Sequence, residues 1–427
     1  MNVLVLGGGG REHALVWRLA SDGSVSNLYC APGNAGIARL ATTVPLDPAS
    51  PADVLAFVEE HDIGLTVVGP ELPLTRGVVD LLGAHGRPIL GPTKAAAEIE
   101  SSKVFAKEFM QRHRVPTAAC EICSSAEDAR RVVASGRFSF PLVLKADGLA
   151  AGKGVIIADD AGAALRTIDT MMVARHFGQA GDRILIEQHL QGPEVSFFVL
   201  SDGARAISFH SAQDHKRAYD DDRGPNTGGM GAFAPSPLVD APMAARITDE
   251  VIAPTIVGMR AEGRPFRGFL YAGLMLTADG PKVLEFNARM GDPEAQVVLP
   301  MLGEDLLPLL RDAAAGTLGR SSSRFSAGAV VGVVLASGGY PDRYETGKPI
   351  TGLDEATSEP DVVVFHAGTA TRGDQVVTAG GRVLTIVGRG SDYASAMARA
   401  YQGVSRISFE GMHYRKDIGA KALRTVR

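Results

Sequence analysis

The chain has 427 residues, more than one hydrophobic core usually supports, so about three domains are expected. With 45% hydrophobic and 21% charged residues, its composition is that of a globular protein and excludes a disordered chain. The formal net charge of -5 gives no general basic surface, so nucleic-acid binding is not expected, although small anions can still bind at local sites.

The cysteine content predicts a reducing compartment. Cys30, Cys120 and Cys123 are too few for a disulfide framework, and the CxxC spacing lacks the partners of a metal site, so packed thiols are the simpler interpretation. The apolar run 3–6 stops at glycines without a basic lead-in, unlike a signal peptide, and the longest apolar stretch, 327–336, is too short to span a bilayer. We therefore expect a cytoplasmic protein with no membrane partner.

Residues 1–100 alternate short β-branched runs with helical stretches. Strands are predicted over 2–6 and 64–68, and helices over 12–19, 51–60 and 73–84. This alternation predicts a doubly wound parallel α/β domain whose ligands bind beyond the strand ends.

Beyond residue 100 the pattern predicts a helix over 101–111, a smaller unit, a central region and a final α+β module. The smaller unit, about 120–195, has predicted strands at 142–145, 155–158 and 183–187 and helices at 126–133 and 161–174. The central region has strands at 196–200, 204–209, 269–276 and 282–287 and a helix at 242–261. After a linker at 321–323, the last module has strands at 329–335, 362–366 and 382–387 and a helix from Tyr393.

The most informative segment is 284–294, LEFNARMGDPE. Alternate side chains of a strand share a face, so Glu285, Asn287 and Arg289 are predicted to lie together. A carboxylate and an amide oxygen are hard ligands for Mg²⁺, and a guanidinium grips a phosphate or carboxylate with two prongs. This combination favours phosphoryl transfer, and an exposed strand with scattered polar residues is the alternative.

Glycine-rich turns supply candidate anion sites. Residues 7–10 are all glycine and precede the first helix, but the third glycine of a dinucleotide fingerprint is replaced by Glu12 or His13, so a single phosphate is the favoured ligand. The turns 31–36 and 68–71 follow strands of the same sheet. The connection 145–154 carries two lysines and several glycines that suit a triphosphate, but it is no Walker loop because Gly154 follows Lys153. Ordinary turns and a solvated hairpin are the alternatives.

Two polar stretches complete the candidates. The apolar strand 184–187 runs into a turn that can offer backbone groups to an adenine, with Glu194 near the ribose, although a purely structural turn is as plausible taken singly. The long polar loop 213–231 contains His215, a conceivable general base that we interpret as a hydrogen-bonding surface group for want of an orienting partner.

Five motifs occur in this order along the chain: GGGGREHA, KADGLAAGKGV, QDHKR, GPNTGGMGA and EFNARMGDPEAQ. Through these motifs the chain resembles, over nearly its whole length, the phosphoribosylamine–glycine ligase family of the ATP-grasp superfamily. The resemblance implies an N-terminal α/β domain (1–100), an ATP-grasp region (101–325) and a C-terminal α+β domain (326–427). Within the ATP-grasp region it implies a mobile lid at about 123–195 and a central part at 196–325. It also implies ATP-dependent ligation of glycine to 5-phosphoribosylamine through glycyl phosphate in purine biosynthesis.

The resemblance further implies roles for individual residues. Those for the nucleotide are Lys103, Lys145, Gly148, Gly152, Lys153, Gly154, Glu187, Gln188, Leu190 and Glu194. Glu285 and Asn287 would bind the metal, Mg²⁺ or Mn²⁺. The acceptor site would be lined by Asp214, Lys216 and Arg289. The phosphoribosylamine would be bound by Gly8, Gly9, Gly10, Arg11, Gly33, Asn34, Glu71 and Asp292.

Two departures from the family pattern bear on this assignment. Met290 replaces the usual phenylalanine, an apolar exchange that should leave the chemistry intact. The segment 271–275 has no metal-binding acid, which separates the chain from carboxylase-like branches. Another ATP-grasp ligase, a nicotinamide dehydrogenase and a non-catalytic nucleotide-binding protein remain alternatives, and a monomer or weak homodimer is expected.

Overall fold

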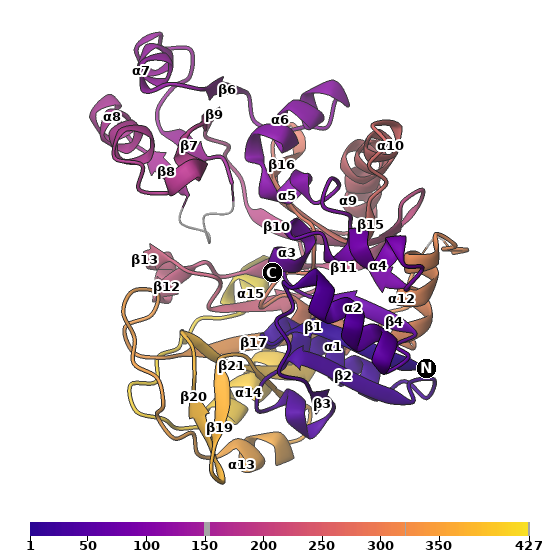
Figure 1. The fold of residues 1–427 in the computed structure, drawn as a ribbon. Helices are drawn as coiled ribbons and strands as arrows, with labels where there is room; N and C mark the ends of the chain where they lie inside the picture. Colours follow the sequence, from indigo (N-terminus) through magenta and orange to yellow (C-terminus); the bar gives the residue numbers. More distant parts are fainter. Residues whose placement is uncertain (149–153, 321, 426–427) are drawn as a thin grey trace.

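The computed structural model describes residues 1–148, 154–320 and 322–425. It confirms a multidomain α/β protein with separate parallel and antiparallel sheets (Figure 1). In these described parts no helix is both long and apolar enough to span a membrane.

The N-terminal unit is a parallel sheet in the order β3-β2-β1-β4-β5. Its strands are β1 (Asn2–Gly7), β2 (Asn27–Pro32), β3 (Thr42–Thr43), β4 (Leu65–Val68) and β5 (Ile89–Leu90), and its helices are α1 (Gly10–Ala20), α2 (Pro51–Glu60), α3 (Glu71–Thr75) and α4 (Val78–Ala84). Val3 and Val5 pack in the core with α1, whereas Leu4 and Leu6 pack with α2 and α4. The alternation along β1 thus buries both faces of the sheet, as the sequence predicted.

The smaller unit follows α5 (Glu98–Ser101) and α6 (Lys103–Arg112). Its antiparallel sheet has the order β6-β9-β7-β8, with β6 (Cys120–Cys123), β7 (Leu142–Ala146), β8 (Val155–Ala158) and β9 (Ile184–Gln188), and it carries α7 (Ala126–Ala134) and α8 (Ala161–Ile168). Figure 1 shows this unit standing apart at the upper left, above the hairpin of β12 (Arg217–Tyr219) and β13 (Arg223–Asn226). Cys120 and Cys123 are free thiols three positions apart on one strand, so they point to opposite faces and cannot share a metal.

An eight-stranded antiparallel sheet, in the order β16-β15-β10-β11-β14-β17-β21-β18, forms the centre of the molecule. Its strands are β10 (Glu194–Asp202), β11 (Ala206–Asp214), β14 (Gly231–Ala234), β15 (Arg267–Thr277), β16 (Gly280–Asn287), β17 (Ala329–Ala336), β18 (Val362–His366) and β21 (Arg382–Gly390). The C-terminal strands therefore continue the central sheet, because β14 pairs with β17. The sequence had predicted the C-terminal strands without their pairing.

Helices cover both faces of this sheet. They are α9 (Ala241–Ile247), α10 (Ala253–Ala261), α11 (Ala295–Val298), α12 (Leu306–Ala315), α13 (Leu353–Ser358), α14 (Tyr393–Val404) and α15 (Ala420–Thr425). A separate hairpin of β19 (Thr369–Arg372) and β20 (Gln375–Thr378) lies between β18 and β21 in the sequence. The helix predicted over 242–261 is interrupted by a wider turn, Thr248–Ile252, just before Pro254. Proline has no N–H to donate, so the regular helical ladder cannot run through this point.

Candidate active site

The predicted metal strand is β16, the edge strand of the central sheet, paired with β15. The carboxylate of Glu285 is exposed, whereas Asn287 is buried at 7% exposure. Burial among neighbouring groups opposes ionisation of Glu285, but the surrounding cations outweigh it and lower its pKa, so it is an anion at neutral pH. These cations are Lys216, Lys145, Lys103 and Arg289.

The two residues supply few metal ligands by themselves. Within the described residues no cluster of three or more histidine, cysteine or acidic side chains could hold a metal ion. Mg²⁺ usually takes one or two protein oxygens and completes its shell with water and nucleotide phosphate, so Glu285 and Asn287 fit this pattern. Asn287 Nδ2 is buried without a hydrogen-bond partner among the described residues, and its Oδ1 accepts a hydrogen bond from Arg289 at 3.1 Å.

The predicted nucleotide lysines lie between the small sheet and β16. Lys145 Nζ donates to the carbonyl of Leu284 at 2.9 Å, so it is fixed directly beside the metal strand. Lys103 Nζ donates to the carbonyl of Gly148 at 2.8 Å. The Ala146 N–H donates to the carbonyl of Gly154, which closes the base of the predicted phosphate loop. Gly152 and Lys153, predicted in the same loop, lie outside the described residues.

The predicted adenine edge lies where β9 ends. Leu190 is buried against Ala118 and Met275, with Leu284 packed on them, which gives a small apolar surface beside the exposed Gln188. The Glu187 side chain does not face solvent: it is buried and pairs with Lys107 and Lys145. Any contact of Glu187 with an adenine would therefore come from its backbone or from an already paired carboxylate.

Two of the three predicted acceptor residues, Asp214 and Lys216, lie at the end of β11. Glu194 Oε2 accepts from Lys216 Nζ at 2.6 Å, so the residue predicted for the ribose and the one predicted for the acceptor are joined. Burial raises the pKa of Asp214, and Glu194 adds to this effect while Lys216 opposes it. Burial opposes the charge of Lys216, but the nearby acids and Tyr271 more than offset it and raise the pKa of Lys216 well above its usual value.

His215 corrects one interpretation from the sequence. It lies at 1% exposure, and both ring nitrogens have no hydrogen-bond partner among the described residues, so it is no surface hydrogen-bonding group. Its ring packs edge-on against Phe233 with centroids 5.8 Å apart. Burial, followed by Lys421 and Arg415, lowers the pKa of His215 to about 3, which makes it a weak base at neutral pH.

Arg289 links the metal strand to the N-terminal unit. Besides Asn287, its guanidinium contacts Glu100 at 3.1 Å and Glu71 at 3.5 Å. Burial works against its charge, but Glu100 and Glu71 more than offset this and raise the pKa of Arg289. The predicted two-pronged grip is thus occupied by protein carboxylates, one of which belongs to Glu71, a residue predicted for the phosphoribosylamine.

The glycine loop between β1 and α1 meets residues from all parts of the chain. A Cβ on Gly8 would lie 2.5 Å from the carbonyl oxygen of Gly33, so only glycine fits there. A Cβ on Gly9 would lie 3.5 Å from Asp292 Oδ2. Arg11 donates to the carbonyl of Met290 at 3.3 Å. The Gly9 N–H is taken by Glu12 at 2.7 Å, so an anion here would rely on Arg11 and other donors.

Asn34 has a different role from the one predicted for its side chain. Its Nδ2 donates to the carbonyls of Gly8 and His366, at 2.9 and 2.8 Å, and its Oδ1 accepts from the N–H groups of Gly36 and Ile37. An amide has two donors and two lone pairs, so its capacity is fully used. The Asn34 side chain holds the glycine loop in place by these hydrogen bonds. Ligand contacts predicted for the turn 31–36 would therefore come from the backbone around Gly33.

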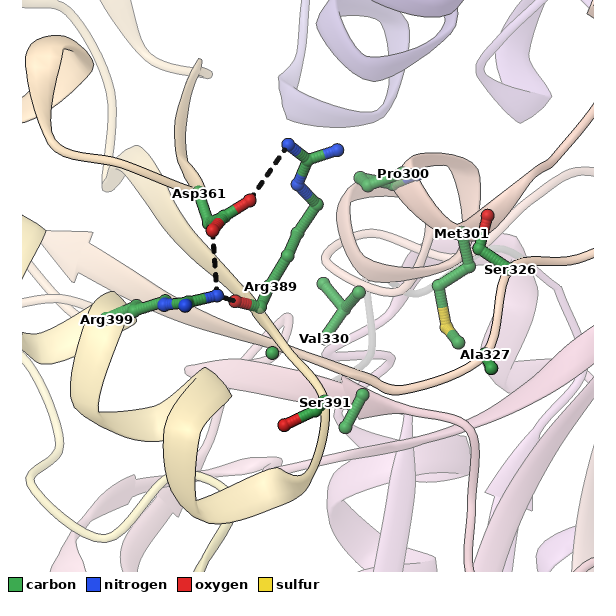
Figure 2. A pocket seen from close by; sticks show the side chains of 11 residues that line it. Pro300, Met301, Ser326, Ala327, Val330, Asp361, Arg389, Ser391 and Arg399 are labelled. Carbon is green, nitrogen blue, oxygen red and sulfur yellow. Dashed lines mark hydrogen bonds and ion pairs between the residues drawn. The ribbon is translucent and has the colours of Figure 1, made fainter.

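A separate pocket of about 330 Å³ lies between the C-terminal strands and the 3-10 helix Leu299–Met301 (Figure 2). Its arginines, Arg389 and Arg399, bracket Asp361 at 3.4 and 2.8 Å. None of the predicted site residues lines this pocket, so it is distinct from the candidate active site.

Several side chains of the site were missed from the sequence: Lys107, Glu100, Glu294 and Arg382. Lys107 lies in the predicted helix 101–111, which gave only an amphipathic signal, and Glu100 lies just before it in α5, which was not predicted. Glu294 is 3% exposed, accepts from Ser196 at 3.2 Å, and has its pKa raised to about 7 by burial and then by Asp214. Arg382, on β21, donates to the carbonyls of Gly228 and Asp292. The DPE motif was a usable sequence signal for Glu294. The other three side chains join the site through contacts between distant elements, and such contacts leave no signal in the sequence.

Comparison with known proteins gives matches over nearly the whole length of the chain. Residues 1–100, 101–295 and 330–421 match the N domain, the ATP-grasp domain and the C domain of phosphoribosylglycinamide synthetase. The phosphoribosylamine–glycine ligases of Chlorobaculum tepidum and Ralstonia nicotianae are 48% and 47% identical over 427 residues, covering 99% of this chain and 100% of each relative.

Solved structures give the same picture of the fold. The crystal structure of phosphoribosylamine–glycine ligase from Thermotoga maritima has a TM-score of 0.85 and 33% identity, and the match covers 98% of this chain and 100% of that one. A biotin carboxylase from Campylobacter jejuni has a TM-score of 0.75 at 16% identity over 98% of this chain and 94% of that one, which shows a shared fold.

Proposed function

Because this chain belongs to the phosphoribosylglycinamide synthetase family, we propose that it is an ATP-dependent ligase that joins glycine to 5-phosphoribosylamine. The products are glycinamide ribonucleotide, ADP and phosphate, in purine biosynthesis. The observation that carries the proposal is a continuous set of contacts across the site. Lys145 is fixed to the strand of Glu285, and Arg289 joins that strand to Glu71 beside the glycine loop.

The reaction needs activation of glycine, because a carboxylate has a poor leaving group. A glycine carboxylate oxygen attacks the γ-phosphorus of ATP, the bond to the β,γ-bridging oxygen breaks, and ADP leaves. The amine nitrogen of phosphoribosylamine then attacks the acyl carbon, loses a proton, and expels phosphate. Lys145 and Lys103 offset charge on the phosphates, so the protein contributes positioning and electrostatics.

A divalent metal, Mg²⁺ or Mn²⁺, supplies further charge neutralisation when bound. Glu285 and Asn287 would hold it: Glu285 is exposed and ionised, and Asn287 Oδ1, which accepts a hydrogen bond from Arg289 at 3.1 Å, is the amide oxygen available beside it. The residues proposed for phosphoribosylamine are the loop Gly8–Gly10, Arg11 and Asp292, which converge between the N-terminal unit and the central sheet.

The decisive measurement is ADP release by the purified protein with ATP and metal. We expect release only when glycine and phosphoribosylamine are both present, and turnover without glycine would favour another ATP-grasp ligase.

With ¹⁸O in the glycine carboxylate, one labelled oxygen should leave in phosphate and the other should stay in the amide. Label in AMP or pyrophosphate would overturn the acyl phosphate route. The cytoplasmic location, the domain boundaries and a monomer or weak homodimer stay predictions.

A further inference from the structure

We propose that Lys107, on α6, is a positioning residue of the nucleotide site: it neutralises Glu187 so that the charge of Lys145 is left for the phosphates of ATP. Lys107 has no direct path to the ligand, since its side chain is 2% exposed. Its role therefore passes through Glu187. The inference rests on ATP being the nucleotide, as proposed above.

The carboxylate of Glu187 lies between two ammonium groups. Its Oε1 contacts Lys107 Nζ at 3.0 Å, and its Oε2 contacts Lys145 Nζ at 2.9 Å. All three side chains are less than a tenth exposed. Burial alone would favour the neutral acid, but Lys145 and Lys107 outweigh it and lower the pKa of Glu187, so Glu187 is an anion between the two ammonium groups. Burial also lowers the pKa of Lys107, and the contact with Glu187 opposes this effect.

The two lysines differ in what remains free. Lys107 Nζ also donates to Thr117 Oγ1 at 2.7 Å and to the carbonyl of Ala118 at 3.3 Å, which uses its three protons. Lys145 Nζ has only Glu187 and the carbonyl of Leu284 as partners among the described residues. One N–H of Lys145 is thus left for a ligand, whereas Lys107 is directed wholly into the protein.

The charge balance shows why the inner lysine matters. With both lysines, the cluster carries a net charge of plus one, and the free donor lies on its outer member. Without Lys107, the negative charge of Glu187 would cancel the positive charge of Lys145. The phosphates of ATP would then lie beside an ion pair with no net charge. In a buried site of low dielectric constant, this loss weakens anion binding strongly.

Lys107 also fixes the site in space. Thr117, which accepts from Lys107, donates its own hydroxyl to the carbonyl of Val283 on β16 at 2.7 Å. Since Glu187 and Lys145 belong to the small sheet, the ammonium of Lys107 ties this sheet to the strand of Glu285. The positions of the phosphate-binding lysine and of the metal strand are therefore coupled.

The test is calorimetric binding of ATP and of adenosine to Lys107→Met, with Lys94→Met, an exposed lysine, as the matched control. We expect the Kd for ATP to rise about tenfold or more while adenosine binding is nearly unchanged, because only the phosphates sense the lost charge. Lys107→Arg, which keeps the charge, should restore part of the ATP affinity. An equal loss for both ligands would overturn the proposal in favour of a general structural role.

The double variant Lys107→Met, Glu187→Gln supplies the second test. It removes the anion together with its inner partner and restores a net charge of plus one, so ATP should bind more tightly than to Lys107→Met alone. Failure to recover, or failure of both variants to fold, would show that Lys107 acts through packing and would contradict the proposal. If the unaltered protein bound no ATP, the proposed function itself would be wrong, which separates the two outcomes.

Discussion

The two carboxylates Glu285 and Glu294 show how burial and neighbours decide the protonation of single residues. Both lie near Lys216 and Arg289. Glu285 has an open face and several cations around it, so its pKa is lowered. Glu294 is enclosed next to Asp214, so its pKa is raised to about 7. One is suited to a metal, and the other can exchange a proton at neutral pH.

Glu285→Gln should remove most of the ligase turnover while the protein stays folded. The change keeps the shape of the side chain but takes away the anionic oxygen that we propose for the metal. Turnover across a Mg²⁺ titration is the measurement, and Asp279→Asn, on the exposed turn of the same hairpin, is the control. Equal activity of both variants at every Mg²⁺ concentration would contradict the metal assignment.

Glu294→Gln should make the protein more stable at pH 8 than the unaltered chain, and not at pH 4. The folded pKa of Glu294 is raised above its ordinary 4.5, so the folded state holds an extra proton and stability falls as the pH rises from about 4.5 to about 7. The gain is at most about 3 kcal/mol. Denaturant unfolding at several pH values measures it, and an identical pH dependence in both proteins would show that this residue is not responsible.

At the scale of elements, β21 brings the C-terminal part of the chain into the candidate site. Arg382 at its start contacts the loop at Gly228, with an N–O distance of 2.7 Å, and the carbonyl of Asp292 at 2.6 Å. Its second nitrogen lies 3.3 Å from Asp292 Oδ2. Along with Arg11, this guanidinium lowers the pKa of Asp292 against the effect of burial. One strand thus orients a loop carried by the central sheet.

Arg382→Met should weaken binding of glycinamide ribonucleotide, the proposed product, by about tenfold, because the Asp292 loop loses its charged hydrogen bonds. ATP binding should change little, since Lys145 and Lys103 are not in contact with Arg382. Calorimetry with both ligands measures the difference, and Arg372→Met, an exposed arginine on β19, is the control. A larger loss for ATP than for the nucleotide product would refute this division.

The sequence predicted most elements because their signals are local. The strands 362–366 and 155–158 were predicted with the bounds that the structure has, as apolar runs bounded by turns are read directly. What could not be predicted depends on pairing between distant segments. The junction of β14 with β17, the ion pair of Lys107 with Glu187, and the use of Asn34 as a fastener all join residues whose spacing carries no periodic signal.

At the scale of the whole molecule, the C-terminal segment closes over the hairpin β12–β13 that follows Lys216. Arg415 is fully buried and donates to Asp417 and Asp222, at 2.7 and 2.9 Å, and to the carbonyl of Arg217. Burial opposes ionisation of Asp417, but the hydrogen bonds from Arg415 outweigh it and lower its pKa. Residues about 200 positions apart thus share one ionic network.

Arg415→Met should lower the free energy of unfolding by about 1–3 kcal/mol, because the partly exposed carboxylates of Asp417 and Asp222 lose their charged hydrogen bonds. Because the folded pKa of Asp417 lies below its ordinary 3.8, its contribution is present above that pH and disappears as the pH falls. The difference between the unaltered protein and Asp417→Asn should therefore shrink below about pH 4. Denaturant unfolding measures both effects, and Arg424→Met, an exposed arginine of the same segment, is the control.

The same substitution should affect the ligase reaction through the hairpin and the adjoining Lys216. Loosening Arg217 and Asp222 leaves the neighbouring acceptor residues less well fixed, so the KM for glycine should rise more than the KM for ATP. Steady-state kinetics with each substrate varied in turn makes this comparison. If both constants rise alike, the C-terminal segment stabilises the fold without positioning the acceptor site. If only the KM for glycine rises, the C-terminal segment helps to position the residues of the acceptor site.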